Sequence, residues 1–199
     1  PLHGNQEGKQ FHGYYDHYCF LPLYVYCGQY LLACVLRNSR IDGAKHAGAI
    51  LKLLVKRVRK VWPNVKIIYR GDSGFNRQPI INWCERNQIS YIVGVAKNPN
   101  LIKLCQRQQN KLAKKFVKTK FKQRHVFGLR YAAKSWKPKR RIIARLEYSD
   151  KGANPRFVVT NLKGLPGDLY DELYCKRGEA ENRIKEVQLD LFGTRSSCS

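Results

Sequence analysis

Two separated stretches of this sequence place carboxylates beside residues of types that commonly bind phosphate. The first, at residues 70–75, reads Arg-Gly-Asp-Ser-Gly-Phe and follows an alternating run at 65–69 that predicts a β-strand. Asp72 therefore comes just past the carboxyl end of a strand, where open α/β sheets place their chemistry. An Asp-Ser-Gly turn without a chemical role explains the same residues on local grounds.

The second stretch is a helix predicted over residues 174–188. Four functional side chains recur there at intervals of three or four residues, which puts them on one helical face: Tyr174, Arg177, Glu181 and Lys185. A carboxylate between an arginine and a lysine suits a site that holds metal and phosphate together. An amphipathic helix with solvated ion pairs is the alternative interpretation. An acid after a strand and an acid on a later helix recur as a divalent-metal pair, which favours Asp72 and Glu181 as metal ligands.

Several separated motifs, in the same order, resemble the DDE transposases of bacterial insertion sequences. The likeness is greatest to the group numbered thirteen-eighty, whose families carry a Tyr, Arg, Glu, Lys signature. It covers nearly the whole chain through the segments 14–24, 72–75, 154–160 and 174–192. The resemblance implies an RNase H-like catalytic domain with Asp72 as the second catalytic acid and Glu181 as the third.

The sequence departs from this pattern in three places. The resemblance puts the first catalytic aspartate on a strand before segment 3–6, so we expect it upstream of Pro1. The chain also contains no methionine, which makes us interpret it as a fragment. The signature lysine falls at Gln188, and we expect Lys185 to take its role. Residues 193–199 resemble nothing in the family, where a further helix covers the sheet.

The resemblance also implies an activity, which is metal-dependent cleavage and transfer of DNA strands at insertion-sequence ends by cut-and-paste transposition. It implies Mg²⁺, with Mn²⁺ as a substitute, a homodimer in the active complex, and a bacterial cytoplasmic, nucleoid-associated protein. We expect Tyr174, Arg177 and Lys185 to contact the DNA. Two alternatives stay open, an RNase H-like nuclease and a catalytically dead basic DNA-binding remnant that lacks the first acid.

The composition favours a polyanionic partner. The 199 residues include 38 Lys+Arg against 14 Asp+Glu, a net charge of +24, and no acid lies between Glu85 and Glu147. Such an excess points first to nucleic acid. No apolar run is long enough to span a bilayer, so a membrane is not expected. The seven cysteines form no Cys-x-x-Cys pair, which argues against a zinc site or a disulfide framework and favours small buried side chains.

The elements that position these residues predict an α/β fold with an RNase H-like mixed sheet flanked by helices. Two β-rich runs should form a hairpin around residues 27–29, with the first run kinked at Pro22 or lying partly at a sheet edge. A helix is predicted over 42–62, with Asp42 as its N-cap and Pro63 as its end. The remaining core elements are a helix at 78–87, strands at 90–95 and 156–161, and a cap at Asp168 for the Glu181 helix.

A basic segment separates the two parts of this core. Residues 101–116 predict a helix, and 126–132 and 140–148 predict strands. Phosphate contacts are expected from Lys114, Lys115, Lys118, Lys120, Lys122 and Arg124, and a disordered basic loop is the alternative. This predicts a first core part over 1–97, a basic β-containing insertion over 98–150, the last strand and the Glu181 helix over 151–192, and a divergent tail over 193–199.

Overall fold

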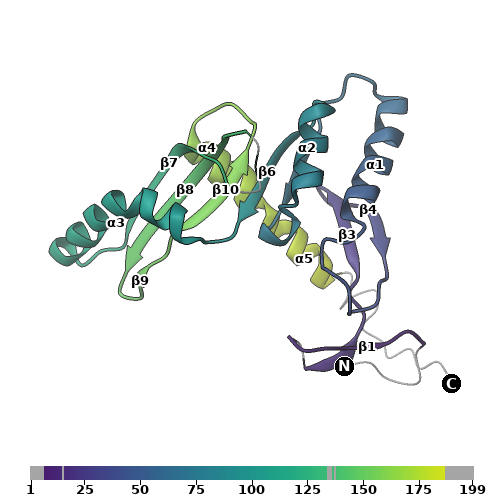
Figure 1. Cartoon of the computed structure of the whole chain (residues 1–199), viewed down its shortest axis with the longest axis horizontal. Helices are drawn as coiled ribbons and strands as arrows, with labels where there is room; N and C mark the ends of the chain where they lie inside the picture. Colours follow the sequence, from purple (N-terminus) through teal and green to yellow (C-terminus); the bar gives the residue numbers. More distant parts are fainter. Residues whose placement is uncertain (1–6, 15, 134–135, 137, 187–199) are drawn as a thin grey trace. The chain divides into compact units, whose positions relative to one another are not determined.

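The computed structural model describes residues 7–14, 16–133, 136 and 138–186, except the side chains of 179–181 and 185 (Figure 1). Its chain divides into two compact units. The sheet unit is Lys66–Lys176, and the hairpin unit is Pro1–Val65 with Arg177–Ser199.

The sheet unit is built on one mixed β-sheet. Its strands lie in the order β5 (Ile68–Gly71), β6 (Ser90–Val95), β10 (Arg156–Thr160), β8 (Arg140–Ser149) and β7 (Gln123–Tyr131), and the short β9 (Gly152–Ala153) pairs with β8. The β5–β6 pair is parallel, whereas the other pairs are antiparallel. A mixed sheet flanked by helices confirms the predicted RNase H-like α/β class, and the strands predicted at 90–95, 126–132, 140–148 and 156–161 are confirmed as well.

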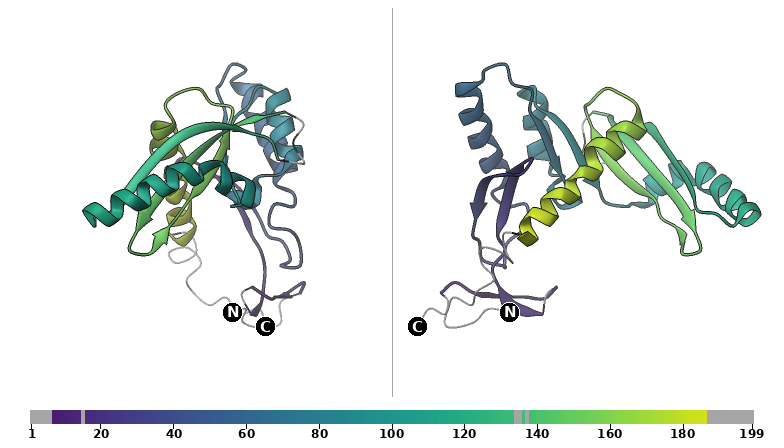
Figure 2. Two further views of the ribbon diagram at one scale, coloured as in Figure 1. Left: turned by 60° about the vertical axis from the view of Figure 1, so that its left-hand side comes forward. Right: turned by 180° about the vertical axis from the view of Figure 1, so that it is seen from behind.

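Helices cover both faces of this sheet. Paired residues of neighbouring strands point to the same side, so each face can be followed across the strands. Ile92, Ile143 and Val158 form one face and pack with Tyr170. That tyrosine belongs to the helical run that begins with α4 (Pro166–Asp168) and η2 (Leu169–Tyr174). The residues next along the strands, such as Val93, lie on the opposite face, which is covered by α2 (Gln78–Arg86) and α3 (Pro99–Thr119). The result is a three-layer arrangement (Figure 2).

Local signals set the ends of the two helices on that face. Pro79 lies in the first turn of α2, as predicted, where its missing N–H costs nothing. At the start of α3, the Asn98 side chain accepts a hydrogen bond from the Leu101 amide at 3.0 Å. Lys120, with φ of 58°, ends α3 in the left-handed conformation.

Residues 98–150, the predicted insertion, supply α3, β7 and β8, and β8 pairs with β10 of the core. Their standing as a separate insertion remains a prediction.

The described part of the hairpin unit contains two antiparallel strand pairs and the helices α1 (Ala47–Val61) and α5 (Gly178–Glu186). β1 (Gln10–His12) pairs with β2 (His17–Cys19), and β3 (Leu23–Cys27) pairs with β4 (Tyr30–Val35). The predicted hairpin around 27–29 is confirmed, and Gly28, with φ of 58°, supplies the left-handed backbone that its turn needs. The first run is divided into β2 and β3, with Pro22 in the gap between the two strands.

Helix α1 (Ala47–Val61) starts later than the sequence predicts. Its N-cap is His46, and Asp42 instead accepts a hydrogen bond from the Ala44 amide at 2.8 Å, within the turn before the helix. The prediction of Asp42 as the N-cap is therefore wrong, because a short polar side chain can stabilise a local turn as readily as a helix start. The predicted end before Pro63 is confirmed.

Candidate active site

Asp72 lies directly after β5, at the carboxyl end of the one parallel strand pair in the described sheet. Its Oδ1 accepts a hydrogen bond from the Gly74 amide at 2.7 Å, and its side chain is half-buried. Asp72 closes the Asp-Ser-Gly turn, and that turn fixes the carboxylate at the end of the strand, while the chemical role of Asp72 remains a prediction. A carboxylate has room for about four acceptor contacts, so the Gly74 bond leaves capacity for a cation.

Gly94 of β6 keeps the space beside this turn free. A Cβ added at Gly94 would lie 2.7 Å from the Ser73 amide nitrogen and 2.8 Å from the Tyr174 hydroxyl. The Tyr174 hydroxyl and the backbone of the Asp72 turn therefore both approach Gly94 closely, and only glycine fits at that position. Sequence reasoning missed Gly94, although a glycine inside the buried run 91–95 is a signal of close backbone approach.

Tyr174 is held in place by packing against the core of the sheet unit. It packs against the core cluster of Ile92, Ile143 and Val158, and its ring lies 5.4 Å from that of Tyr170. Arg70 of β5 donates a hydrogen bond to the Leu173 carbonyl at 2.7 Å, which ties the strand before Asp72 to the residue before Tyr174. The structure thus brings together two of the residues that the sequence singled out, Asp72 and Tyr174.

The helical run that carries Tyr174 differs from the predicted regular α-helix. It begins at Pro166 and passes through a π-helical segment, Leu169–Tyr174, and a 3₁₀ turn, η3 (Cys175–Arg177), before α5 (Gly178–Glu186). Asp168 makes no side-chain cap, so that prediction is wrong. The prediction that Tyr174 and Arg177 share one helical face assumed 3.6 residues per turn. It does not apply between these two residues, because π and 3₁₀ turns have a different number of residues per turn.

Glu181 and Lys185 lie on α5, in the hairpin unit, together with Arg177 at the end of η3. The side chains of Glu181 and Lys185 and all of Gln188 fall outside the described residues. Their part in a site with Asp72 therefore remains a prediction.

The six basic residues predicted to contact phosphate are ordered but fall into two sets. Lys114, Lys115 and Lys118 are exposed on α3, and Lys120 is exposed at its end. Lys122 and Arg124 have acidic partners, Glu147 at 3.1 Å and Asp171 respectively. The alternative of a disordered loop is wrong for this segment, because α3 runs to Thr119 and β7 starts at Gln123.

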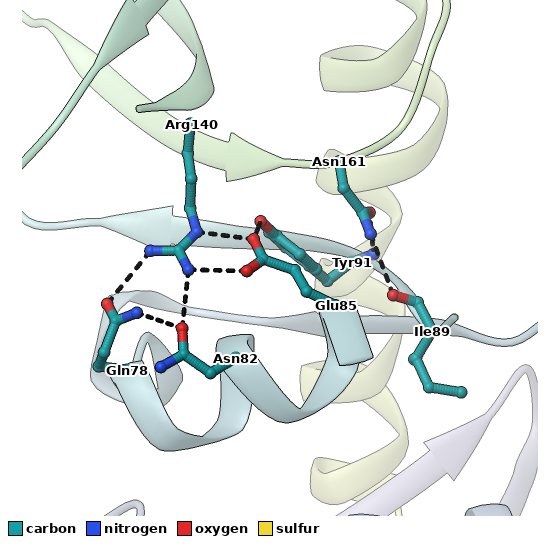
Figure 3. A network of polar contacts seen from close by, with 7 residues as sticks. All are labelled: Gln78, Asn82, Glu85, Ile89, Tyr91, Arg140 and Asn161. Carbon is teal, nitrogen blue, oxygen red and sulfur yellow. Dashed lines mark hydrogen bonds and ion pairs between the residues drawn. The ribbon is translucent and has the colours of Figure 1, made fainter. Parts of the chain in front are cut away.

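A polar network that the sequence did not reveal holds α2 against the sheet (Figure 3). The buried Arg140 of β8 donates to both carboxylate oxygens of Glu85, at 2.7 and 2.8 Å, and to Asn82 at 2.8 Å. Tyr91 of β6 donates to Glu85 at 2.7 Å, and the Arg140 hydrogen bonds lower the Glu85 pKa. The network fixes the helix that follows the Asp72 turn.

The residues 1–199 match the model of the family described as transposase DDE domain group 1. The chain belongs to this family. No curated protein and no solved structure matches the chain. Membership in the transposase DDE domain family implies a transposition-related nuclease that acts on DNA, and such enzymes generally use divalent metal ions.

The residues of this transposase domain can be tested against such a metal. The described part of the chain contains no group of three or more His, Cys, Asp or Glu side chains that could enclose an ion. The hard, half-buried carboxylate of Asp72 nevertheless fits Mg²⁺, which is commonly held by one or two carboxylates together with substrate phosphates and water.

Six described cysteines are free, and Cys27, Cys34 and Cys175 are exposed, so the prediction that most cysteines are buried is wrong.

None of the described helices of the transposase domain combines the length and the apolar character that a membrane span needs.

Proposed function

We propose that this transposase domain cleaves and transfers DNA strands at the ends of a bacterial insertion sequence of group thirteen-eighty, in a cut-and-paste reaction. The observation that carries the proposal is the position of Asp72. It follows the parallel strand β5, is anchored by the Gly74 amide, and lies beside the Tyr174 hydroxyl across Gly94. A half-buried acid held rigidly at a sheet edge is what a metal-dependent phosphodiester reaction requires of its protein ligand.

In this proposal Asp72 and Glu181 hold the divalent metal, Mg²⁺ or Mn²⁺, and a further aspartate comes from a strand upstream of His3. When bound, the metal activates a water or a 3′-hydroxyl and stabilises the leaving oxygen. Tyr174 stacks on a base or donates to a phosphate from its place beside the Asp72 turn. Arg177 and Lys185 bind flanking phosphates through charge and carry no sequence information.

The wider setting follows from the same proposal. The active complex is a homodimer on the terminal repeats and the target DNA, in the nucleoid of a bacterial cell. Residues 1–97 and 151–192 form the RNase H-like core, and 98–150 form the insertion that helps to hold the DNA.

The deciding experiment is cleavage and strand transfer of a labelled duplex that carries an element end, with Mg²⁺ or Mn²⁺. The protein is assayed as residues 1–199 and together with any residues that its reading frame encodes before Pro1. We expect Asp72→Asn and Glu181→Gln to abolish cleavage in the active form while DNA binding is kept or slightly strengthened, because each removes a charge that repels phosphate. The matched control is Asp150→Asn, an exposed acid in the turn between β8 and β9.

Each alternative function has its own outcome in this assay. Binding without cleavage in every form supports the DNA-binding remnant and contradicts the proposal. Metal-dependent nicking without strand-transfer products supports a nuclease. Near-normal cleavage by Glu181→Gln shows that the third acid lies elsewhere, and Glu179 and Glu186 are the next acids to test.

A further inference from the structure

We propose that the outer face of α3 is a separate binding site for the phosphate backbone of duplex DNA. The site is a cationic stripe of five residues, Lys103, Arg107, Lys111, Lys114 and Lys118. The proposal rests on the DNA substrate that the family implies, and it assigns the contact to a surface away from Asp72.

The spacing of these five residues aligns them along the helix. They follow one another at intervals of four, four, three and four residues, which at 100° per residue places all five within an arc of about 80°. Helix α3 is 21 residues long, and the stripe runs along about 22 Å of it, with the Cβ atoms of neighbouring members about 5 to 6 Å apart. All five residues are exposed.

The opposite face of α3 is fixed to the sheet. Leu101 and Cys105 are fully buried there, and Phe116 packs on Tyr148 of β8 with ring centroids 5.5 Å apart. Figures 1 and 2 show α3 lying along β7 and β8. Because this face is buried, α3 presents the cationic stripe outward as a rigid rod, and binding needs no ordering of the helix.

No acid in the described part of the chain pairs with the stripe. None of the five cations forms an ion pair with a residue in the described ranges, and no Asp or Glu occurs between Glu85 and Glu147. Like charges three or four residues apart on a helix repel and destabilise it. A helix that keeps five of them in a row is matched to an anion from outside, and their regular spacing matches a polyanion.

Duplex DNA fits this surface better than a single strand or a membrane. Single-strand sites depend on aromatic side chains for stacking, and the stripe has none, since Phe116 is turned towards Tyr148. A membrane-binding helix inserts a continuous apolar face, whereas the face of α3 that carries Leu101 and Cys105 is buried in the sheet unit and its exposed apolar side chains, Ile102, Leu104 and Val117, form no such face. A row of cations without base-reading geometry predicts backbone contacts that do not depend on sequence.

The register also separates the stripe from Lys122 and Arg124. Arg124 pairs with Glu147 across the β7–β8 ladder, whereas Tyr148, the residue after Glu147, faces α3. Successive strand residues point to opposite sides, so the acids that hold Lys122 and Arg124 lie on the far side of the sheet from the stripe. These two basic residues are assigned to structure, not to this DNA site.

The test is binding of the chain to a duplex of about 30 base pairs in EDTA, with affinity measured at several salt concentrations. The stripe variant combines Lys103→Gln, Arg107→Gln and Lys111→Gln. We expect the slope of log K against log salt to become shallower by about 2 to 3, and affinity near 0.1 M salt to fall on the order of 10²-fold. A charge-keeping variant, Lys103→Arg with Arg107→Lys and Lys111→Arg, should retain the slope.

Two controls remove the same kind of charge elsewhere. Three exposed lysines outside the stripe, Lys45, Lys151 and Lys163, are changed together to Gln, and the slope should change by less than about one. The pair Lys122→Gln and Arg124→Gln should also leave the slope unchanged. If the stripe variant matches these controls, or if the Lys122–Arg124 pair carries the loss, the proposal is wrong.

Competition with other polyanions completes the test. Equal affinity for a single strand of the same length, or tighter stripe-dependent binding to phosphatidylserine vesicles, would overturn the assignment to duplex DNA. Because binding is measured in EDTA, this result is independent of the proposed metal-dependent cleavage. If the stripe variant binds DNA normally, the Asp72 cleavage assay still stands, and cleavage can fail while binding through α3 persists. If the unaltered chain shows no salt-dependent binding, both proposals fail.

Discussion

Two sets of basic residues in the same acid-free stretch, 86–146, have different surroundings. One set is held by acids that reach it from outside the stretch: Arg140 by Glu85, Arg145 and Lys122 by Glu147, and Arg124 by Asp171. The other set, the cationic stripe of α3, is exposed and forms no ion pair with a described residue. The comparison teaches that a stretch of one charge sign in the sequence is not one functional surface, because folding neutralises part of it and leaves the rest for a partner.

The largest effect is expected where the neutralised set is deepest. Glu85→Gln would leave the Arg140 guanidinium, whose side chain is 3% exposed, without its anionic partner. Removing one partner of a fully buried pair costs about 3 kcal/mol of the free energy of unfolding, and because the Glu85 side chain is 32% exposed we expect a smaller loss of about 2 kcal/mol. Urea unfolding measures this, and Glu172→Gln, which removes an exposed pair with Lys176, serves as the control with a loss below about 1 kcal/mol. Equal losses of unfolding free energy in both variants would show that the buried Arg140 depends on its acidic partner no more than an exposed cation does.

A second prediction concerns space rather than charge. Gly94→Ala puts a Cβ 2.7 Å from the Ser73 amide nitrogen and 2.8 Å from the Tyr174 hydroxyl, so β6 or the Asp72 turn has to move. We expect a loss of about 2 kcal/mol in the free energy of unfolding, as for other overpacked interiors. Gly167→Ala is the matched control, because an added Cβ there meets nothing within 4 Å. Unchanged stability of Gly94→Ala would show that the Asp72 turn is not fixed by this contact.

Acid titration distinguishes the two charge sets by pH. Hydrogen bonds from Arg140 hold the folded-state pKa of Glu85 below its usual value, so this contribution to stability is complete above about pH 4.3 and is lost as pH falls through the lower folded-state pKa. Unfolding measured from neutral to acidic pH should show a shallower decline for Glu85→Gln than for the unaltered chain. The stripe variant removes no carboxylate, so its stability should decline with falling pH as that of the unaltered chain does.

The smallest effect is expected for the stripe itself. Replacing Lys103, Arg107 and Lys111 by Gln should change the free energy of unfolding by no more than about 0.5 kcal/mol, with a small gain as the expected direction, because like-charge repulsion along α3 is relieved. Thermal unfolding at low salt checks this. A loss of 2 kcal/mol or more would mean that these residues stabilise the sheet unit, and would weaken their assignment to a partner.

The sequence by itself determined most elements of the sheet unit. The apolar run 90–95 and the periodic pattern of α3 are local signals that produced the predicted strand and helix, whereas the alternating run at 65–69 forms a strand only from Ile68, in β5. It also determined that Asp72 follows a strand, because only the order of elements along the chain is needed for that. Helix starts were predicted less well, as Asp42 and Asp168 show, since a short acidic side chain serves a turn as well as a cap.

Only the tertiary structure decided which side chains meet. Arg140 and Glu85 are 55 residues apart, and Arg124 and Asp171 are 47 apart, so no local pattern marks them as partners. The approach of Tyr174 to the Asp72 turn across Gly94 depends on β6 lying between β5 and β10. Residue spacing records the period of a helix or strand, whereas contact between distant residues depends on the order and register of strands. For that reason the acid-free stretch looked uniform in the sequence and became two sets of charges in the fold.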